Sequence, residues 1–371
     1  MDADELLEDY APGDFFFSTA RRTILGSGSV RAFTNTDAVS LSGDASAALA
    51  EHPASFAVGV LPFDTAAAPG YLVLPRTVRV AGGARPAGRK PVTAPAAVRA
   101  VPEPVRHAEA VARAVKILRE RGMRKVVLAR ALDLDFDAEV AAQAILTNLL
   151  VDKAGGYTFA APLPSGRSLL GATPELLLSR AGGQVVSYPH AGSAPRSGDP
   201  VTDRENGEGL ARSRKDHVEH AVLTEAVVET LRPFCRRLDV PREPSLVSTP
   251  AMWHLGTKIT GELADRDVTA LRLAAALHPT PAICGSPTEA ARELVGQLEP
   301  FDRGYYAGTV GWMDARGDGE WAVSIRCAEV GERSLRLYAG GGIVSASDPK
   351  AELDETSAKF QTFLHAMGLE L

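Results

Sequence analysis

The stretch 157–188, YTFAAPLPSGRSLLGATPELLLSRAGGQVVSY, decides the fold. It contains four short β-forming segments, YTFAAP, SLLGA, ELLLSR and QVVSY, separated by turn-forming Gly, Pro and Ser residues. No helical pattern lies between one segment and the next, so strands and helices do not alternate in regular βαβ order. This order favours an α+β protein with largely antiparallel sheets.

The residues before this stretch predict a helix, a strand and a second helix. Apolar residues recur at helical spacing in 105–122, KVVLARALDLDF (125–136) predicts a strand, and AEVAAQAILTNLL (138–150) predicts a helix. FFFST (15–19) belongs to a region of short strands and loops. Residues 81–104 are rich in Pro, Ala and Gly, and predict a linker-like stretch or mobile surface loop.

The residues after this stretch predict helices first and strands later. A long helix is expected at roughly 203–238, with shorter helices at 271–278 and 289–298. The segments YAGTVGWMD, WAVSIRCAEV and SLRLYAGGGIV predict strands. A last helix is expected from Pro349 to about Gly368, because Asp-Pro is a good cap and first-turn pair.

Composition excludes several classes of protein. The formal charge of −6 over 371 residues disfavours binding to nucleic acid or to an anionic membrane. The three cysteines are scattered and lack CxxC spacing, so we expect reduced thiols and no zinc site. The acidic N-terminus does not resemble a signal peptide, and no apolar run is long enough to cross a bilayer. The expected location is the cytoplasm.

Two pairs of acidic residues share the same spacing. Asp216 and Glu219 lie in KDHVEH, and Glu352 and Glu355 lie in KAELDET. Spacing of three residues places both side chains of a pair on one helix face. Four converging carboxylates would need a cation, and oxygen ligands without His or Cys suit Mg2+ better than zinc. Each pair alone is more typical of a solvated helix face.

Other segments are candidates for binding an anion or lining a pocket. The glycines of YAGGGIV (338–344) allow close backbone approach and an amide nest, although a bulge or tight turn is the alternative. Arg326, expected on the strand VSIRCAEV, needs a partner if buried: either a substrate carboxylate or an ordinary salt bridge. The loops 189–198 and 278–287 are candidate pocket walls, and His278 is equally a candidate structural histidine.

These motifs together resemble the chorismate-utilising enzymes, which include isochorismate, salicylate, anthranilate and aminodeoxychorismate synthases. The matching motifs run in family order from about residue 15 to the C-terminus: FFFSTARRT, KVVLAR, GATPELLL, HAGSAPRSG, SRKDHVEH, TPAMWHLGTKITG, HPTPAICGSP, LEPFDRGYYAGTVGW, VSIRCA, YAGGGIV and ELDET. The likeness is greatest to siderophore-type isochorismate synthases. It implies one large α+β domain over 1–371, with two antiparallel β-sheets, outer helices and an active site between the sheets.

The resemblance implies catalytic roles for two residues. Lys125, which opens KVVLAR, matches the family's general base that activates water. Glu175, in TPELLL, matches the general acid that protonates the departing C4 hydroxyl. This chemistry requires a deprotonated lysine, and a raised pKa that lets Glu175 hold a proton to donate. Without the resemblance, both residues are typical of solvated strand ends.

The resemblance also implies Mg2+ and substrate ligands. Glu219 and Glu355 match direct Mg2+ ligands, and Asp216 and Glu352 match positions that reach the metal through water. The matching substrate-binding positions are Gly192, Ser193, His278, Ala282, Tyr306, Arg326, Gly340, Gly341 and Gly342. The implied substrate is chorismate, bound by a monomer without an amidotransferase partner, nucleic acid or membrane.

The choice among the family's reactions depends on a few residues. Lys125 favours water over ammonia as nucleophile, which argues against the two amidotransferase-dependent reactions. Ala282 resembles the pattern of isochorismate synthases, whereas Tyr306 resembles relatives that also eliminate pyruvate. We therefore expect Mg2+-dependent, reversible conversion of chorismate to isochorismate for siderophore (2,3-dihydroxybenzoate or salicylate) biosynthesis. The alternatives are a salicylate synthase, a menaquinone-pathway enzyme and a non-catalytic paralogue. His190 departs from the family pattern, in which an aliphatic residue is common.

Overall fold

The computed structural model describes residues 2–52, 55–152, 156–249 and 252–369. In these ranges the strands form sheets of ten, nine and three strands, and every neighbouring pair is antiparallel. The ten-stranded sheet contains β1 (Phe15–Ser18), β2 (Thr23–Ser27), β6 (Thr77–Ala81), β7 (Ala97–Val101), β8 (Lys125–Asp135), β9 (Tyr157–Pro162), β10 (Ser168–Thr173), β18 (Gly285–Ser286), β21 (Cys327–Val330) and β22 (Ser334–Ile343). The predicted α+β class with large antiparallel sheets is confirmed.

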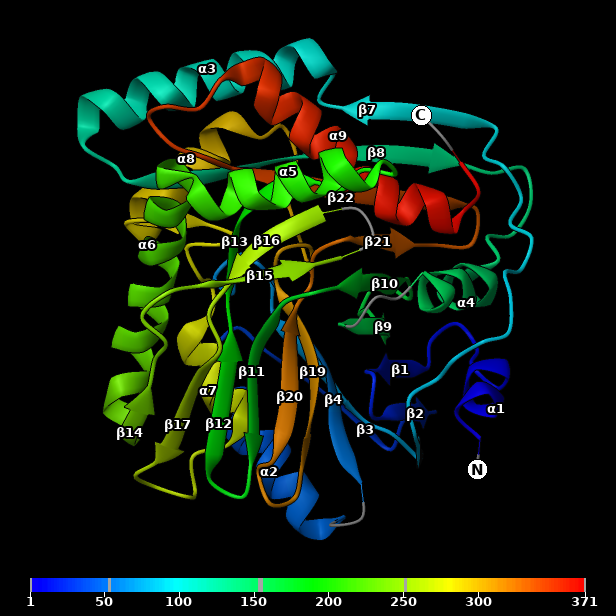
Figure 1. Ribbon diagram of the computed structural model, residues 1–371. Coiled ribbons are helices and arrows are strands. Elements are labelled where there is room, and N and C mark those ends of the chain that lie inside the picture. The colour runs from blue at the N-terminus through cyan, green and yellow to red at the C-terminus, as the bar shows by residue number, and fades with distance from the viewer. Residues whose placement is uncertain (1, 53–54, 153–155, 250–251, 370–371) are drawn as a thin grey trace.

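The other two sheets use the remaining strands of the described chain. The nine-stranded sheet contains β3 (Arg31–Asn35), β4 (Phe56–Leu61), β5 (Gly70–Leu74), β11 (Leu176–Ala181), β12 (Gln184–Tyr188), β14 (Cys235–Asp239), β17 (Ile259–Leu263), β19 (Thr309–Asp314) and β20 (Gly319–Val323). The small sheet contains β13 (His190–Pro195), β15 (Ser245–Ser248) and β16 (Met252–Gly256). In Figure 1 the strands of the two large sheets run in steeply different directions.

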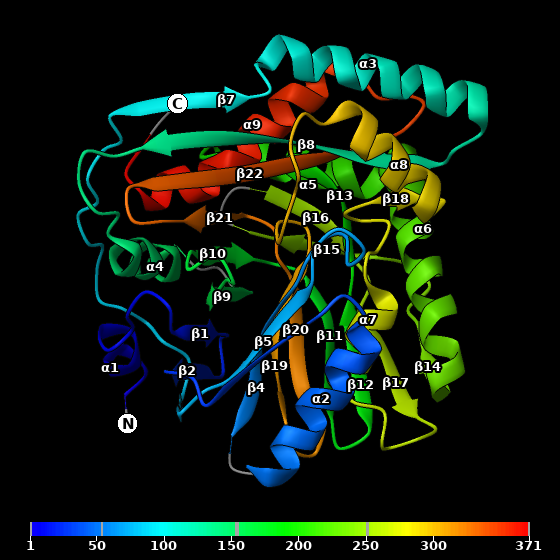
Figure 2. The same cartoon turned by 180° about the vertical axis from the view of Figure 1, so that it is seen from behind.

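Helices cover the outer faces of the sheets (Figures 1 and 2). They are α1 (Ala3–Glu8), α2 (Ala38–Glu51), α3 (Pro104–Arg121), α4 (Ala142–Val151), α5 (Pro200–Arg212), α6 (Arg214–Leu231), α7 (Ala270–Leu277), α8 (Thr288–Leu298) and α9 (Pro349–Ala366), with a short 3-10 turn at Arg232–Phe234. Helices α3 and α4 pack against α9, which lies on β22. On the nine-stranded sheet, α7 packs on β11 and β20, and α2 packs on α7. No helix of the described ranges is long and apolar enough to cross a membrane.

The alternation of side chains in β1 explains how the ten-stranded sheet is buried on both faces. Phe15 and Phe17 belong to the apolar core shared with Val58 of β4, whereas Phe16 belongs to a second core that includes Phe363 of α9. Successive side chains of a strand point to opposite faces, so a continuous apolar run is expected where both faces are covered. One core therefore joins the two large sheets, and the other joins the ten-stranded sheet to its helices.

The stretch 157–188 contributes one hairpin to each large sheet. Strands β9 and β10 pair in the ten-stranded sheet, and β11 and β12 pair in the nine-stranded sheet. The chain crosses from one sheet to the other between Thr173 and Leu176, at Pro174 and Glu175. This crossing places Glu175 between the two sheets.

Three elements differ from the sequence prediction. The helix expected at 203–238 is broken at Ser213, whose extended backbone and side chain cap α6, and its last residues form β14 against β17. The prediction of a loop at 81–104 is wrong for residues 97–101, which form β7 and pair with β8. Arg326 lies between β20 and β21 rather than within a strand, and its φ of 51° is left-handed. The mobility of residues 82–96 stays a prediction.

Candidate active site

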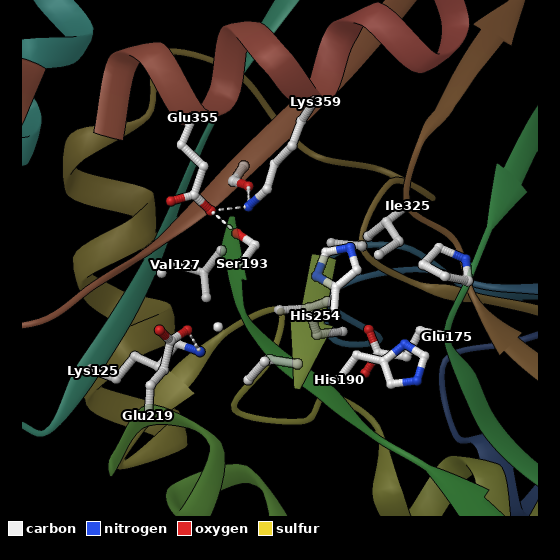
Figure 3. Close-up of a pocket in the computed structure, with 18 of the residues that line it drawn as sticks. Lys125, Val127, Glu175, His190, Ser193, Glu219, His254, Ile325, Glu355 and Lys359 are labelled. Atoms are coloured by element: carbon white, nitrogen blue, oxygen red, sulfur yellow. Dashed lines mark hydrogen bonds and ion pairs between the residues drawn. The ribbon is translucent and has the colours of Figure 1, made fainter. Parts of the chain in front are cut away.

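A cavity of about 180 Å3 opens where both large sheets meet the small sheet, α6 and α9 (Figure 3). It brings together residues that are far apart in the chain. The predicted site residues that line it are Lys125, Glu175, Gly192, Ser193, Asp216, Glu219, Ala282, Tyr306, Arg326, Gly340, Gly342 and Glu355. The structure thus gathers most of the residues that the sequence singled out.

Lys125 begins β8 and reaches the cavity from a buried position. Its side chain is 2% exposed, and its Nζ donates to Oε1 of Glu219 at 2.7 Å. Gly342 of β22 makes this contact possible, because a Cβ there would lie 2.6 Å from Glu219 Oε1 and 2.7 Å from Lys125 Cε. Any side chain at position 342 would have to displace the ion pair.

Glu175 lies on the other side of the cavity from Lys125 (Figure 3). Its residue is 4% exposed, and burial raises the pKa of its carboxyl from 4.5 to about 7. A hydrogen bond from the backbone N–H of His190, and the charges of Lys125 and Arg326, oppose this rise. A large fraction of Glu175 is therefore protonated near neutral pH, as a general acid requires.

Arg326 points into the cavity from a strained backbone. The chain leaves the sheet after β20, and Arg326 has a left-handed backbone with φ of 51°. Two residues before it, the carbonyl of Ser324 accepts a hydrogen bond from the amide of Ala307. Burial lowers the pKa of Arg326, and no described carboxylate lies within ion-pair distance of its guanidinium. A buried, unpaired guanidinium is costly, and a ligand carboxylate would satisfy it with paired hydrogen bonds.

The two acid pairs approach the same side of the cavity from α6 and α9. Glu219, Asp216 and Glu355 line the cavity, whereas Glu352 lies behind Gly341, whose added Cβ would be 3.2 Å from Glu352 Oε2. Burial raises the pKa values of Asp216 and Glu352, and the neighbouring acid of each pair raises them further. The structure therefore brings the two pairs together, with their negative charges close to one another.

Three of these four acids form ion pairs with lysines in the described structure. Lys125 pairs with Glu219, Lys359 with Glu355 at 2.5 Å, and Lys215 with Glu352 at 3.6 Å. Among the residues described, no three His, Cys, Asp or Glu side chains already stand in an arrangement that could hold a metal ion. The donor set nevertheless fits a hard divalent cation, since Glu352 Oε2 is buried without a hydrogen-bond partner.

Two predicted substrate ligands lie elsewhere. His278 is outside the cavity, and its Nε2 hydrogen-bonds the carbonyl oxygens of Pro62 and Phe63. Gly341 faces α9, because successive residues of β22 alternate between the two faces of the sheet. Direct contact between His278 and a substrate is therefore not part of this arrangement.

The sequence reasoning missed two lysines and a histidine of the cavity. Lys359 follows Glu355 by one helical turn, a spacing that could have indicated an ion pair. Lys215 carried no such signal, because its partner lies on a different helix. His254 stood in the quoted motif TPAMWHLGTKITG, but nothing local indicated that its ring lines the cavity.

Known proteins resemble this chain in sequence and in fold. The family model described as chorismate binding enzyme matches residues 84–368. The isochorismate synthase DhbC of Bacillus subtilis is 46% identical, over 99% of this chain and 97% of its own. The vibriobactin-specific isochorismate synthase of Vibrio cholerae is 40% identical, over 96% of this chain and 92% of its own.

A solved structure also matches the fold of this chain. The crystal structure of DhbC from Bacillus anthracis superposes with a TM-score of 0.95 at 42% identity, covering 99% of this chain and 100% of that chain. The superposition includes both large sheets, because it spans nearly the whole chain. The chain belongs to the chorismate binding enzyme family.

Proposed function

We propose that this protein is an isochorismate synthase, which interconverts chorismate and isochorismate with Mg2+. The observation that carries the proposal is the placement of Lys125 and Glu175 on opposite sides of one cavity (Figure 3). A base and an acid so placed can act on a ring held between them. The relatives named isochorismate synthases, at 40% identity and above over most of the chain, support this assignment.

Lys125 and Glu175 divide the proton transfers of the reaction. In the deprotonated form that the reaction requires, Lys125 would take a proton from water as the water oxygen bonds to C2 of the ring. The ring double bonds shift, the bond from C4 to its hydroxyl breaks, and Glu175 donates the proton that lets the hydroxyl leave as water. One water enters and one leaves, so the product is an isomer of the substrate. The raised pKa of Glu175 keeps its proton available.

The remaining cavity groups suit the two carboxylates of chorismate. Arg326 offers a guanidinium without an ion-pair partner, and Gly340 and Gly342 bring the backbone of β22 to the cavity wall. Glu219 and Glu355 would hold Mg2+, with Asp216 and Glu352 supporting it. When bound, Mg2+ supplies positive charge that neutralises a substrate carboxylate.

The product feeds siderophore synthesis, which the relatives specific for 2,3-dihydroxybenzoate and vibriobactin support. The proposed enzyme acts on chorismate as a cytoplasmic monomer. It needs no amidotransferase subunit, because Lys125 suits water rather than ammonia as the nucleophile. Size-exclusion chromatography with light scattering tests the oligomeric state, and a mass twice that of the 39.1 kDa chain would contradict the monomer.

A salicylate synthase is the second candidate, and Tyr306 is the observation that favours it. The Tyr306 ring lines the cavity, stacks on Tyr338 at 4.8 Å, and has its hydroxyl 2.7 Å from where a Cβ of Gly340 would lie. Such a hydroxyl could contact the enolpyruvyl group. Ala282, which also lines the cavity, favours the synthase without lyase activity.

Incubation of the purified protein with chorismate, with and without Mg2+, tests both candidates. Products are separated by liquid chromatography and identified by NMR. We expect isochorismate and chorismate to approach an equilibrium mixture only when Mg2+ is present. Salicylate and pyruvate at neutral pH would replace the first candidate by the second, and unchanged chorismate would exclude both.

A further inference from the structure

Strand β8, which begins at Lys125, has a gap in its pairing along one edge. Strand β22 pairs with residues 126–135 on the opposite edge. On the edge with the gap, β18 pairs with residues 125–126 and β7 pairs with residues 131–135. Residues 127–130 therefore have no strand beside them on this edge in the described chain. Buried backbone groups left there without partners would cost stability.

A buried ion pair fills this gap, beside helix α8, which packs against β8 and β18 (Figure 2). Glu299, the residue after α8, accepts the backbone N–H of Ala129 on Oε1 at 2.7 Å. Arg303 donates from Nη2 to the carbonyl of Val127 at 2.7 Å. Its Nε and Nη2 also donate to the two Glu299 oxygens, at 2.8 and 2.5 Å. Both side chains are 2% exposed. The pair thus replaces a strand over this part of β8.

Arg303 also joins β8 to a second wall of the cavity. Its Nη1 donates to the carbonyl of Ile283 at 2.8 Å, and its guanidinium lies over the Phe63 ring at 4.3 Å. Ala282 and Ile283 line the cavity from the loop before β18, and Val127 lines it from β8. The planar fork of one guanidinium therefore holds the two chain segments at a fixed spacing.

The ion pair takes no part in the proposed chemistry, because Arg303 and Glu299 lie behind the residues that line the cavity. Buried ion pairs of this kind contribute little net stability, since two apolar side chains of similar volume often serve as well. Apolar side chains could not, however, bind the backbone groups of Val127, Ala129 and Ile283. The pair is therefore suited to fixing the position of these segments.

We infer that Arg303, braced by Glu299, is a positioning residue for the proposed reaction. It fixes the spacing between β8, which carries Lys125, and the loop that carries Ala282 and Ile283. A base must lie within hydrogen-bond reach of the proton that it takes, and a displacement of about 1 Å can lower turnover about 100-fold. The inference rests on the proposed isochorismate synthase activity.

Arg303→Met tests this role, because methionine fills part of the space and removes every donor. We expect kcat to fall by about tenfold or more and KM for chorismate to rise by about threefold or more, since both the base and the wall of the cavity move. KM is the decisive measurement: a partly unfolded sample has a lower apparent kcat but an unchanged KM. Urea unfolding of each variant gives its folded fraction under the assay conditions.

Arg180→Met is the matched control. Arg180 of β11 is also buried and pairs with Asp318 at 2.5 Å. It likewise donates to two backbone carbonyls, those of Arg266 and Arg316, but it does not line the cavity. This variant should unfold at a lower urea concentration than the wild type while keeping wild-type KM and wild-type kcat per folded molecule. A rise of KM equal to that in Arg303→Met would overturn the inference, because the effect would then follow from lost stability.

Arg303→Lys covers the case in which Arg303→Met does not fold. Lysine keeps the positive charge opposite Glu299, but an ammonium cannot bind the carboxylate and both carbonyls in one planar arrangement. We expect kcat to fall and KM to rise, each by less than in Arg303→Met.

The outcomes separate this inference from the proposed function. A wild-type protein that converts chorismate, together with wild-type kcat and KM in a folded Arg303 variant, would overturn the inference alone. A wild-type protein that leaves chorismate unchanged would overturn both.

Discussion

At the residue scale, burial favours the protonated form of the Glu175 carboxyl near neutral pH, and ionising that buried carboxyl costs stability. The folded protein holds the Glu175 proton more tightly than the unfolded chain does, since the pKa rises from 4.5 to about 7. The stability that the neutral carboxyl provides is therefore present below pH 4.5 and is lost as the pH rises through about 7. The same titration removes the proton that the proposed reaction requires of Glu175.

Glu175→Gln should consequently inactivate the enzyme while stabilising it. We expect the variant to unfold with about 2 kcal/mol more free energy than wild type at pH 8, and with no difference at pH 4. Urea unfolding at both pH values measures this, and turnover of the wild type should decline as the pH rises through about 7. Glu320→Gln, at a half-buried acid outside the cavity, is the control and should remain active. A less stable Glu175→Gln at pH 8 would contradict the account.

Residue types were the easiest part of the site to predict. Lys125, Glu175 and the acid pairs were found because the motifs carrying them are contiguous in the chain. The place of His254 in the cavity wall and the pairing of Lys215 with Glu352 were not found, because both depend on which strands and helices meet. The left-handed backbone of Arg326 was also missed, since its apolar neighbours continue the strand pattern.

At the element scale, the close pairing of β8 and β22 shapes the floor of the cavity. Gly342 pairs with Val127, and no space for a side chain remains beside Lys125 and Glu219. Strand β8 was predictable from its continuous apolar run, and so was α9 from its cap. The break between α5 and α6 was not, because it depends on the packing of both helices against β13.

Gly342→Ala tests this floor. The added methyl should displace the ion pair of Lys125 and Glu219, reduce turnover by more than about tenfold, and cost about 1–3 kcal/mol of stability. Gly296→Ala in α8 adds the same methyl where no atom lies within 4 Å, and should gain about 0.5–1 kcal/mol. Activity assays and thermal unfolding of both variants measure these effects. A fully active Gly342→Ala would contradict the steric argument.

Glu219 of helix α6 is one of the two proposed direct metal ligands, and this role is testable without an activity assay. Glu219→Gln should weaken Mg2+ binding by at least about tenfold, measured by isothermal titration calorimetry. Glu225→Gln, on the same helix but exposed and paired with Arg124, should bind Mg2+ as the wild type does. Equal Mg2+ affinity in the two variants would remove Glu219 from the metal site.

At the scale of the whole molecule, one apolar core joins the two large sheets. Its members come from β1 and β8 of one sheet and from β4 and β20 of the other, and Trp321 lies fully buried among them. The sequence predicted the two sheets through the family resemblance. The passage of the chain from one sheet to the other at Glu175 depends on the long-range pairing of β10 with β21 and of β11 with β20, which no local pattern reveals.

A shared core predicts that the chain over 1–371 unfolds as one domain. Tryptophan fluorescence, which reports mainly on the nine-stranded sheet and β16, should change with the same urea midpoint as far-ultraviolet circular dichroism. Two separated transitions would contradict the single-domain account.

The central claim is that water attacks C2 while the C4 hydroxyl departs, and oxygen-18 labelling tests it most directly. Chorismate is incubated with the enzyme and Mg2+ in H2(18)O, and the isochorismate formed early in the reaction is analysed by mass spectrometry and NMR. The account predicts one oxygen-18 atom in the product, at the C2 hydroxyl. Unlabelled isochorismate would mean that the C4 hydroxyl migrates within the molecule, and would contradict the roles assigned to Lys125 and Glu175.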